Sequence, residues 1–462
     1  MAESRTFTGL LAATAVGVYL LVLAGATTTL TDAAAACTTW PLCDGPVDVT
    51  NTALLVAWGH RLVAAAVGLL VVAMTVVGLR SNCRGRVKAA IILGAALYPV
   101  QIALGAVVAT TTETALPGAH LALGMGIFGS FVLALAWHLE AETGSDDETP
   151  VKNPTLAPEP ADDGPERSPT LSARERVIET LSAYFRLMKP RLMWLLCLVA
   201  AAGMALAAGQ TLTVRTVLLT LGGGVLSIGA SGTFNHVLER DIDKRMDRTS
   251  DRPIATHQIP VRNALAFGLL LSFASLWLFW QVNALVAVLG LTAIVFYSVI
   301  YTLVLKPNTV QNTVIGGAAG ALPALIGWVA ADGSVGLPGV ILAIVIFLWT
   351  PAHFYNLALA YKDDYEAGGF PMMPVVRGET ETRKHIVYYL GATLIASGVL
   401  GVLTSLGWLY AVTSVLLGAV FLWAVILLHR EQTEAAAFRA FHASNAYLGA
   451  VLIAIVVDAL AL

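Results

Sequence analysis

Two acidic segments carry the side chains best suited to chemistry. In the first, Asn235, Glu239, Asp243 and Asp247 recur at every fourth position. On a helix this spacing places them in a row on one face. Carboxylates four residues apart repel by about 0.2–0.5 kcal/mol per pair, so such a row predicts a cation among them. Oxygen ligands of this kind suit Mg²⁺, which binds carboxylates together with water and substrate phosphates.

The second acidic segment contains Asp363 and Asp364, with Lys362 directly before them. Basic residues also follow the carboxylates of the first segment, among them Arg248 and Arg252, and these suit an anion. Two carboxylate clusters that face one cavity, each with cations beside it, form a site for a metal-bridged diphosphate. The alternative is an ordinary charged loop that obeys the positive-inside trend of membrane proteins.

The apolar segments around these clusters must position them. The chain of 462 residues is 57% hydrophobic and only 12% charged, whereas a soluble protein carries about 25% charged residues. Runs of roughly 20 apolar residues cross a bilayer as helices, because lipid offers no partners for backbone polar groups. We therefore expect an all-α polytopic membrane protein with about 13 transmembrane helices. They lie near residues 8–30, 54–79, 88–109, 116–138, 191–209, 214–236, 261–280, 283–304, 311–330, 337–358, 384–405, 407–428 and 441–461.

A polar stretch divides these spans into two groups. Residues 141–170 are rich in proline, aspartate and glutamate, and this composition is typical of a disordered linker. Apolar residues at helical spacing follow, from Val177 to Met188, and predict a helix that lies on the membrane surface. The predicted domains are a four-helix bundle at 1–140, a linker and amphipathic helix at 141–182, and a nine-helix bundle at 183–462.

The distribution of Lys and Arg sets the orientation. Placing the N-terminus inside collects nearly all of them on the inner side and leaves only Arg61 and Arg215 near the outer side. The same count places both acidic segments inside. We expect a multi-pass protein of the plasma membrane, with its N-terminus and active-site loops in the cytoplasm.

The C-terminal part, about 183–462, resembles the intramembrane aromatic prenyltransferases, and among them the protohaem IX farnesyltransferases, or haem O synthases. The first motif of the superfamily, N-x-x-x-D-x-x-x-D, is matched by Asn235, Glu239 and Asp243, with Glu239 in place of the usual Asp. The second D-x-x-x-D of the superfamily is reduced to two adjacent aspartates. The blocks of the haem-specific subfamily occur in order at Lys189-Pro190-Arg191, Arg248 to Pro253, Tyr301 to Pro323, Pro351 to Phe354 and Lys362 to Tyr365.

The resemblance implies transfer of a farnesyl or similar isoprenoid group from its diphosphate to a vinyl group of protohaem IX. The products would be haem O and diphosphate, in haem A biosynthesis, with Mg²⁺ as cofactor and no role for nucleic acid. The implied catalytic residues are Asn235, Glu239, Asp243, Lys306, His353, Lys362 and Asp364. The implied diphosphate-binding residues are Lys189, Arg191, Arg248 and Arg252, and the implied Mg²⁺ ligands are Glu239, Asp243, Asp247, Asp363 and Asp364. His353 is either a hydrogen-bonded histidine at a helix end or a group that contacts the acceptor or takes a proton.

The first four spans contain a second candidate site. His60 and His120 begin the second and fourth spans on the outer side, and two imidazoles on facing helices can ligate one haem iron. A histidine inside a membrane is otherwise a structural hydrogen-bonding residue. Cys37 and Cys43 lie in an outer loop, where a disulfide is permitted. They would be redox-active or would only staple the loop.

This part resembles half of a haem A synthase. The matching blocks run from Cys37 to Gly45, at His60-Arg61, from Pro99 to Gly105 and at His120. The family usually carries a Glu one helical turn before its first haem histidine, where this chain has Ala57. A single repeat provides one haem site where the full protein has two. Oxidation of haem O would therefore need self-association or a separate haem A synthase, and binding or passing on haem is the alternative role.

Three functions compete on the sequence. The first is a haem O synthase fused to the haem A synthase-like half. The second is a prenyltransferase that acts on a quinone precursor. The third is a transporter or a haem-carrying electron-transfer protein, although charges gathered at one membrane face are not typical of a transporter, whose charges lie near the bilayer midplane.

Overall fold

The computed structural model of the chain describes residues 2–30, 33–43, 48, 50–111, 116–144, 149–158, 172–404 and 406–461. These residues form helices and connecting loops, with no strand in the part described. Thirteen helices are long and apolar enough to cross a membrane, which confirms the expected number of spans. The spans are α1 Ala2–Leu30, α3 Thr52–Arg80, α4 Gly85–Thr110, α5 Leu116–Thr143, α7 Pro190–Ala208, α8 Val214–Leu238, α10 Val261–Trp280, α11 Ala284–Val295 with its continuation, α13 Asn312–Asp332, α14 Leu337–Ala360, α17 Glu379–Leu403, α18 Trp408–Glu431 and α19 Glu434–Ala461.

Shorter elements join the spans. A π-helix, Phe296–Leu305, and the short α12, Lys306–Asn308, continue α11, so that this span runs from Ala284 to Asn308. The remaining short helices are α2 Ala33–Ala36, α6 Ala173–Leu187, η1 Gly209–Thr211, α9 Arg240–Asp243, α15 Lys362–Ala367 and α16 Met373–Val376.

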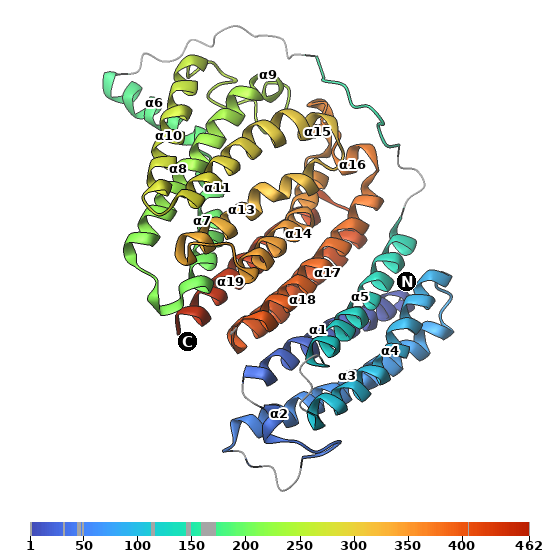
Figure 1. Ribbon diagram of the computed structural model, residues 1–462. Coiled ribbons are helices and arrows are strands. Elements are labelled where there is room, and N and C mark those ends of the chain that lie inside the picture. Colours follow the sequence, from blue (N-terminus) through green and yellow to red (C-terminus); the bar gives the residue numbers. More distant parts are fainter. Residues whose placement is uncertain are drawn as a thin grey trace. The chain divides into compact units, whose positions relative to one another are not determined.

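The chain packs into two compact units. The first comprises residues 1–146 and 383–454, and the second comprises residues 147–382 and 455–462. The first unit therefore combines α1, α3, α4 and α5 with α17, α18 and most of α19 (Figure 1). The predicted division of the sequence into a four-helix and a nine-helix domain stays a prediction, because the boundary of a compact unit need not coincide with the boundary of a domain defined by sequence.

Buried polar pairs join the helices of the first unit. The hydroxyl groups of Tyr19 on α1 and Ser414 on α18 lie 2.8 Å apart, and the indole nitrogen of Trp137 donates to the hydroxyl of Tyr388 at 2.6 Å. A polar group in lipid needs an internal partner. These pairs provide partners across helices that are far apart in the sequence.

Close backbone contact brings α7 and α13 together in the second unit. A Cβ atom on Gly327 would lie only 2.0 Å from the carbonyl oxygen of Ala200, and one on Gly203 would lie 2.5 Å from that of Ala324. Only glycine permits this approach. The packing holds the middle of α7 directly against the second half of α13.

Part of the stretch expected to be a disordered linker is ordered. The N–H of Val151 donates to the carbonyl of Val375, and the N–H of Ala157 donates to that of Ala367, each at 2.9 Å. Gly369 has a positive φ of 66°, and a Cβ there would lie 3.0 Å from the backbone nitrogen of Leu156. The expectation of disorder is wrong for this stretch, because its backbone finds partners that composition does not reveal. Residues 159–171 of the same stretch lie outside the described residues.

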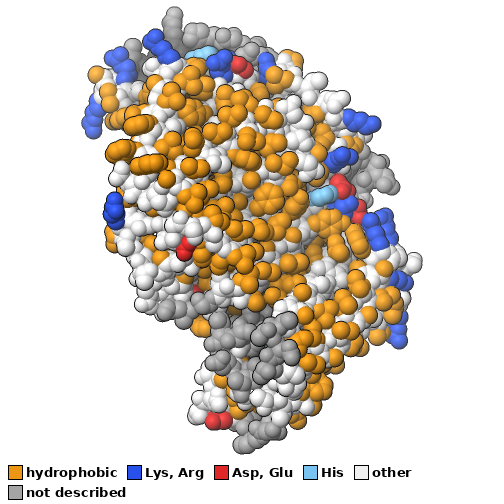
Figure 2. Space-filling view, in the orientation of Figure 1, with side chains coloured by type: hydrophobic (Ala, Val, Ile, Leu, Met, Phe, Trp, Pro, Cys, Tyr) orange, Lys and Arg blue, Asp and Glu red, His pale blue; other side chains and the backbone are white. Residues whose placement is uncertain are grey.

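Apolar side chains cover the surface of the spans. Figure 2 shows them over the visible face, with Lys and Arg mostly at its margins. On α10, Leu269, Leu270, Phe273 and Trp277 are each more than half exposed. Such a surface is stable in lipid and confirms a multi-pass membrane protein. The apolar face of α6 is exposed as well, and its expected place on the membrane surface stays a prediction.

Candidate active site

The turn between α6 and α7 presents Lys189. This residue has a positive φ of 56°, and its Nζ donates to Oδ1 of Asn235 and, at 3.3 Å, to the hydroxyl of Tyr297. Gly232 on α8 makes room for the turn, since a Cβ there would lie 2.8 Å from the carbonyl oxygen of Leu187. The absence of a side chain at Gly232 thus allows Lys189 to reach the C-terminal end of α8.

The first acidic segment is not one continuous helix. Helix α8 ends at Leu238, Glu239 forms its cap, and the four-residue α9 ends at Asp243. Glu239 and Asp243 are buried, whereas Asp247 is exposed in the loop beyond. The expected row therefore stops at Asp243, because the helical register that would align Asp247 with it is lost.

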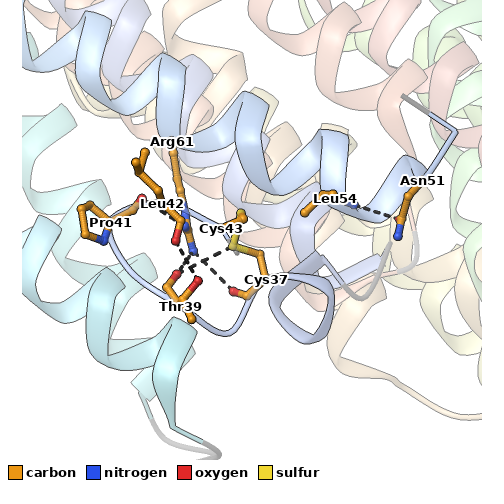
Figure 3. The surroundings of a disulfide bond; sticks show 8 residues. All are labelled: Cys37, Thr39, Pro41, Leu42, Cys43, Asn51, Leu54 and Arg61. Carbon is orange, nitrogen blue, oxygen red and sulfur yellow. Dashed lines mark hydrogen bonds between the residues drawn. A yellow bond between two sulfur atoms is a disulfide. The ribbon is translucent and has the colours of Figure 1, made fainter. Parts of the chain in front are cut away.

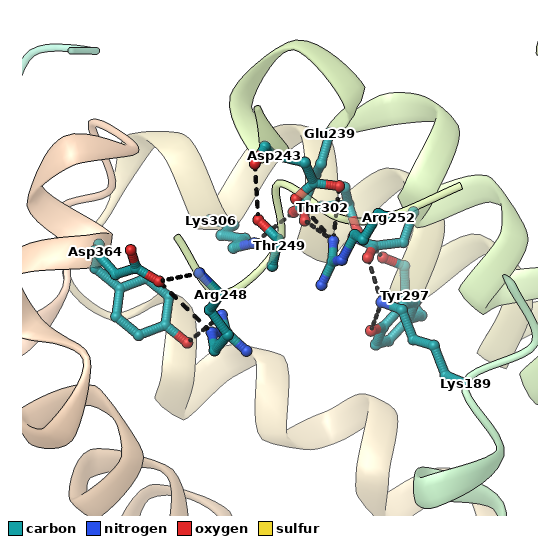
Figure 4. Close-up of polar contacts among 12 residues, drawn as sticks. Lys189, Glu239, Asp243, Arg248, Thr249, Arg252, Tyr297, Thr302, Lys306 and Asp364 are labelled. Carbon is teal, nitrogen blue, oxygen red and sulfur yellow. Dashed lines mark hydrogen bonds and ion pairs between the residues drawn. The ribbon is translucent and has the colours of Figure 1, made fainter. Parts of the chain in front are cut away.

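Two cations meet the buried carboxylates (Figure 4). Nη1 of Arg252 lies 2.8 Å from both carboxylate oxygens of Asp243 and 3.8 Å from Oε2 of Glu239. Nζ of Lys306 lies 2.6 Å from Oε1 of Glu239 and 4.1 Å from the centre of the Phe370 ring. The cation expected among the carboxylates is thus supplied by the chain itself.

The π-helix orients three of these side chains. The hydroxyl of Thr302 donates to the carbonyl of Tyr297, five residues earlier, at 2.8 Å. Nδ2 of Asn235 donates in turn to the hydroxyl of Thr302 at 3.2 Å. A single widened stretch of helix therefore brings Tyr297, Thr302 and Lys306 to the C-terminal end of α8. π-helices of this kind are frequent at functional sites.

The second acidic segment joins the first through Asp364. Its Oδ1 accepts a hydrogen bond from the backbone N–H of Asp247 at 2.8 Å, and its Oδ2 accepts one from that of Arg248 at 3.1 Å. The guanidinium of Arg248 donates to the hydroxyl of Tyr365 at 3.3 Å and lies 5.0 Å from the ring centre of Tyr361. The two segments, over a hundred residues apart in the sequence, thus form one site.

Four other residues expected at the site are exposed or make contacts with residues outside the cluster. Lys362 pairs with Glu379 at 3.1 Å, and Asp363 is exposed. The ring of His353 stacks on that of Trp349, with centres 4.2 Å apart. Arg191 is exposed at the start of α7. The adjacent positions in the motifs therefore do not all face the cluster.

Burial and neighbouring charges together shift the pKa values of Lys189, Glu239 and Asp243. Burial lowers the pKa of Lys189 to about 7; Arg252 and Lys306 act in the same direction, and Glu239 and Asp243 oppose them. Burial acts to raise the pKa of Glu239, but the neighbouring cations outweigh it and the net shift is downward. Burial raises the pKa of Asp243 despite the opposing effect of Arg252. A lysine that titrates near neutral pH is well placed to respond to an incoming anion.

The carboxylates fit a divalent ion that shares its ligands with a substrate. Within the described ranges, no group of three or more His, Cys, Asp or Glu side chains could hold a metal alone. Glu239 and Asp243 nevertheless converge on one cationic nitrogen of Arg252, which stands where a metal ion would lie. One or two carboxylates with substrate phosphates are a usual set of ligands for Mg²⁺.

A second candidate site is a cavity of about 270 Å³ in the first unit. His60 and His120 line it together with Gln101, whose Nε2 lies 3.3 Å from Nε2 of His120. The Nδ1 atoms of both histidines are buried and have no hydrogen-bond partner among the residues that the structure describes. Close glycines leave room for the imidazoles, because a Cβ on Gly105 would lie 2.9 Å from the His120 ring.

A disulfide-closed loop lies beside this cavity (Figure 3). Cys37 and Cys43 are joined by a disulfide, and Cys37 lines the cavity. Arg61, next to His60, donates to the carbonyl oxygens of Thr39 at 2.8 Å and Pro41 at 3.0 Å. The disulfide and Arg61 therefore hold the loop from two sides.

The sequence and fold were compared with those of known proteins. The model of the UbiA prenyltransferase family matches residues 196–447. The chain belongs to this family. It is 94% identical to a protein of Haloarcula marismortui named Protoheme IX farnesyltransferase, over 100% of both chains. It is 67% identical to Protoheme IX farnesyltransferase 1 of Natronomonas pharaonis, over 98% of this chain and 99% of the relative.

Among solved structures, a digeranylgeranylglyceryl phosphate synthase is similar in fold. The TM-score is 0.52 at 18% identity, and the match covers 62% of this chain and 100% of the other. The chain is thus a membrane prenyltransferase with the UbiA fold.

Three contributors to the prenyltransferase site escaped the sequence analysis: Tyr297, Thr302 and Phe370. They are uncharged and lie in apolar surroundings, so nothing in their type points to a polar site. The only available signal was that Tyr297 and Thr302 precede Lys306 in one span. The π-helix that turns all of them one way leaves no pattern in the sequence.

Proposed function

We propose that the chain transfers a farnesyl group from its diphosphate to a vinyl group of protohaem IX, and so forms haem O and diphosphate. Membership of the UbiA prenyltransferase family supports the transfer, and the names of the two relatives support the acceptor. The observation that carries the proposal is the meeting of both acidic segments in one cation-rich cluster, through Asp364 and the backbone of Asp247 and Arg248.

The cations of the cluster receive the diphosphate. Lys189, Arg248 and Arg252 carry N–H donors that would bind its oxygens and stabilise the charge that develops as the allylic C–O bond breaks. The vinyl group of the haem attacks the freed allylic carbon, and water adds to the resulting cation to give the hydroxyethyl-prenyl side chain. Asp364 acts here by holding Arg248 in place through the backbone.

Mg²⁺ would be held by Asp243 and Glu239 together with the diphosphate. When bound, it neutralises charge on the leaving group. Arg252 contacts both of these carboxylates, so its guanidinium would leave Asp243 and bind the diphosphate where Asp243 holds the metal ion. Lys306 stays on Glu239. Asp247, Asp363 and Asp364 complete the proposed acidic set at the edge of the site.

We propose in addition that the first unit binds haem through His60 and His120. The cavity between them and their two unpartnered nitrogens support this role. Ala57 also lines the cavity, where a haem A synthase usually has Glu. Oxidation of haem O would therefore depend on a second copy of the chain or on a separate haem A synthase. The bound haem gives a visible spectrum, which His60→Ala and His120→Ala should abolish and His442→Ala, at an exposed position, should leave unchanged.

The proposed location is the plasma membrane, with the N-terminus and the prenyltransferase cluster on the cytoplasmic side. The excess of Lys and Arg near the inner ends of the spans supports this orientation. The proposed domain division, with a linker and amphipathic helix at residues 141–182, is supported by the family match, which begins at residue 196.

Product mass tests the proposed reaction. Purified protein is incubated with haem, Mg²⁺ and farnesyl diphosphate, and the porphyrins are weighed by mass spectrometry. A haem that gains a farnesyl group and a hydroxyl group, the proton of the added water being released, supports the proposal. Asp243→Asn should lose this product, whereas Asp241→Asn, at a nearby exposed position, should keep it. The same incubation with a quinone precursor in place of haem tests the alternative acceptor. Prenylation of the quinone alone, or haem movement without a new mass, would contradict the proposal.

A further inference from the structure

Lys306 is enclosed at the prenyltransferase cluster. Its Nζ lies 2.6 Å from Oε1 of Glu239, and the residue is only 9% exposed. The centre of the Phe370 ring lies 4.1 Å from the same Nζ. The ammonium group is therefore buried between a carboxylate and an aromatic ring, where leaving Glu239 would cost it its charged partner.

Arg252 occupies a looser position. Its Nη1 lies 2.8 Å from both oxygens of Asp243 and 3.8 Å from Oε2 of Glu239. It lies in the loop after α9, so its side chain can swing while every helix stays in place. A divalent ion can therefore replace Arg252 at Asp243 at little structural cost.

We propose that Lys306 is a permanent counter-cation which takes the place of a second divalent ion at Glu239, so that the site accepts one metal ion, at Asp243. This inference rests on the proposed Mg²⁺-diphosphate function. A metal ion on Oε1 of Glu239 would lie beside the ammonium group, and like charges at such a distance repel strongly. Both oxygens of Asp364 accept backbone N–H bonds, and Asp247 and Asp363 are exposed. Of the two buried carboxylates in the first acidic segment, this leaves Oε2 of Glu239 and the carboxylate of Asp243 for a metal.

The number of bound metal ions tests this proposal. The full-length protein in detergent is dialysed to equilibrium against Mn²⁺ with and without inorganic pyrophosphate, and the excess metal per chain is counted. We expect one Mn²⁺ per wild-type chain in the presence of pyrophosphate and two for Lys306→Met. Lys306→Arg keeps the cation and should bind one. Lys306→Met combined with Glu239→Gln removes both charges and should also return to one.

Two metal ions on the wild type, or one on Lys306→Met, would overturn the inference. Size-exclusion profile and thermal melting establish that each variant is folded, and Lys306→Gln provides a second neutral variant if the Met variant misfolds. The wild-type count alone decides the matter if neither neutral variant folds. A wild type that binds neither Mn²⁺ nor pyrophosphate would contradict the proposed function itself, and this outcome is distinct from a wrong count.

Discussion

Lys189 should make the binding of diphosphate depend on pH. Burial lowers its pKa to about 7, so its ammonium loses a proton as pH rises through neutrality. An anion that needs the charged form binds about tenfold more weakly for each pH unit above that value, since one unit corresponds to about 1.4 kcal/mol. Binding should therefore weaken toward alkaline pH. Lys189→Arg keeps its charge over the whole range, because a guanidinium does not titrate in proteins.

Between pH 6 and pH 8.5 the charged fraction of a group with a pKa of about 7 falls about thirtyfold. We expect the dissociation constant of inorganic pyrophosphate, measured by calorimetry, to rise over this pH range. The rise should be about thirtyfold larger for the wild type than for Lys189→Arg. The ionisation of pyrophosphate affects both proteins equally and cancels in the ratio of their constants. A ratio that stays flat over this range would refute the position assigned to Lys189.

Four further substitutions follow from the structure. Asp364→Asn removes an acceptor for the N–H groups of Asp247 and Arg248, each such charged hydrogen bond being worth about 1.5–3 kcal/mol; kcat/KM should fall by about 10- to 100-fold while Asp241→Asn, at an exposed position outside the proposed acidic set, stays near wild type, and equal effects would contradict the loop contact. Gly232→Ala places a Cβ 2.8 Å from the carbonyl of Leu187, so KM for the prenyl diphosphate should rise, whereas Gly224→Ala on the same helix has open space and should be silent in the same assay. Asp243→Asn leaves Arg252 without its buried partner and should lower the free energy of unfolding by about 3 kcal/mol; it also removes a proposed Mg²⁺ ligand, so farnesyl transfer should be lost, and retention of full activity would exclude Asp243 from the site. Cys43→Ser opens a loop of six-residue separation and should lower the stability of the first unit by about 2 kcal/mol and weaken haem binding without affecting prenyl transfer, whereas Cys83→Ser should change neither.

The sequence was sufficient for the fold because the apolar runs are long and separated by charged loops. In lipid each apolar run must form a helix to satisfy its backbone polar groups, and the Lys and Arg residues of the loops then predict which helix ends lie on the same side of the membrane. The same reasoning placed Glu239, Asp243 and Asp364 on one side of the membrane. The helical spacing was misleading for Asp247, since nothing in the sequence pattern reveals that α9 ends at Asp243.

The partners of the carboxylates were beyond the sequence. Spacing indicates that Glu239 and Asp243 need a cation, but it cannot tell a metal ion from Arg252 or Lys306. Lys306 reaches Glu239 only because the preceding turns form a π-helix. The contact between Asp364 and two backbone N–H groups likewise depends on the path of a loop, which side-chain patterns do not encode.

A structure determined with Mn²⁺ and farnesyl thiodiphosphate, an analogue that resists ionisation, would test the central claim most directly. The account predicts an anomalous manganese peak beside Asp243, with the thiodiphosphate within hydrogen-bonding distance of Lys189 and Arg248. Manganese and thiodiphosphate bound away from the junction of the two acidic segments would contradict it.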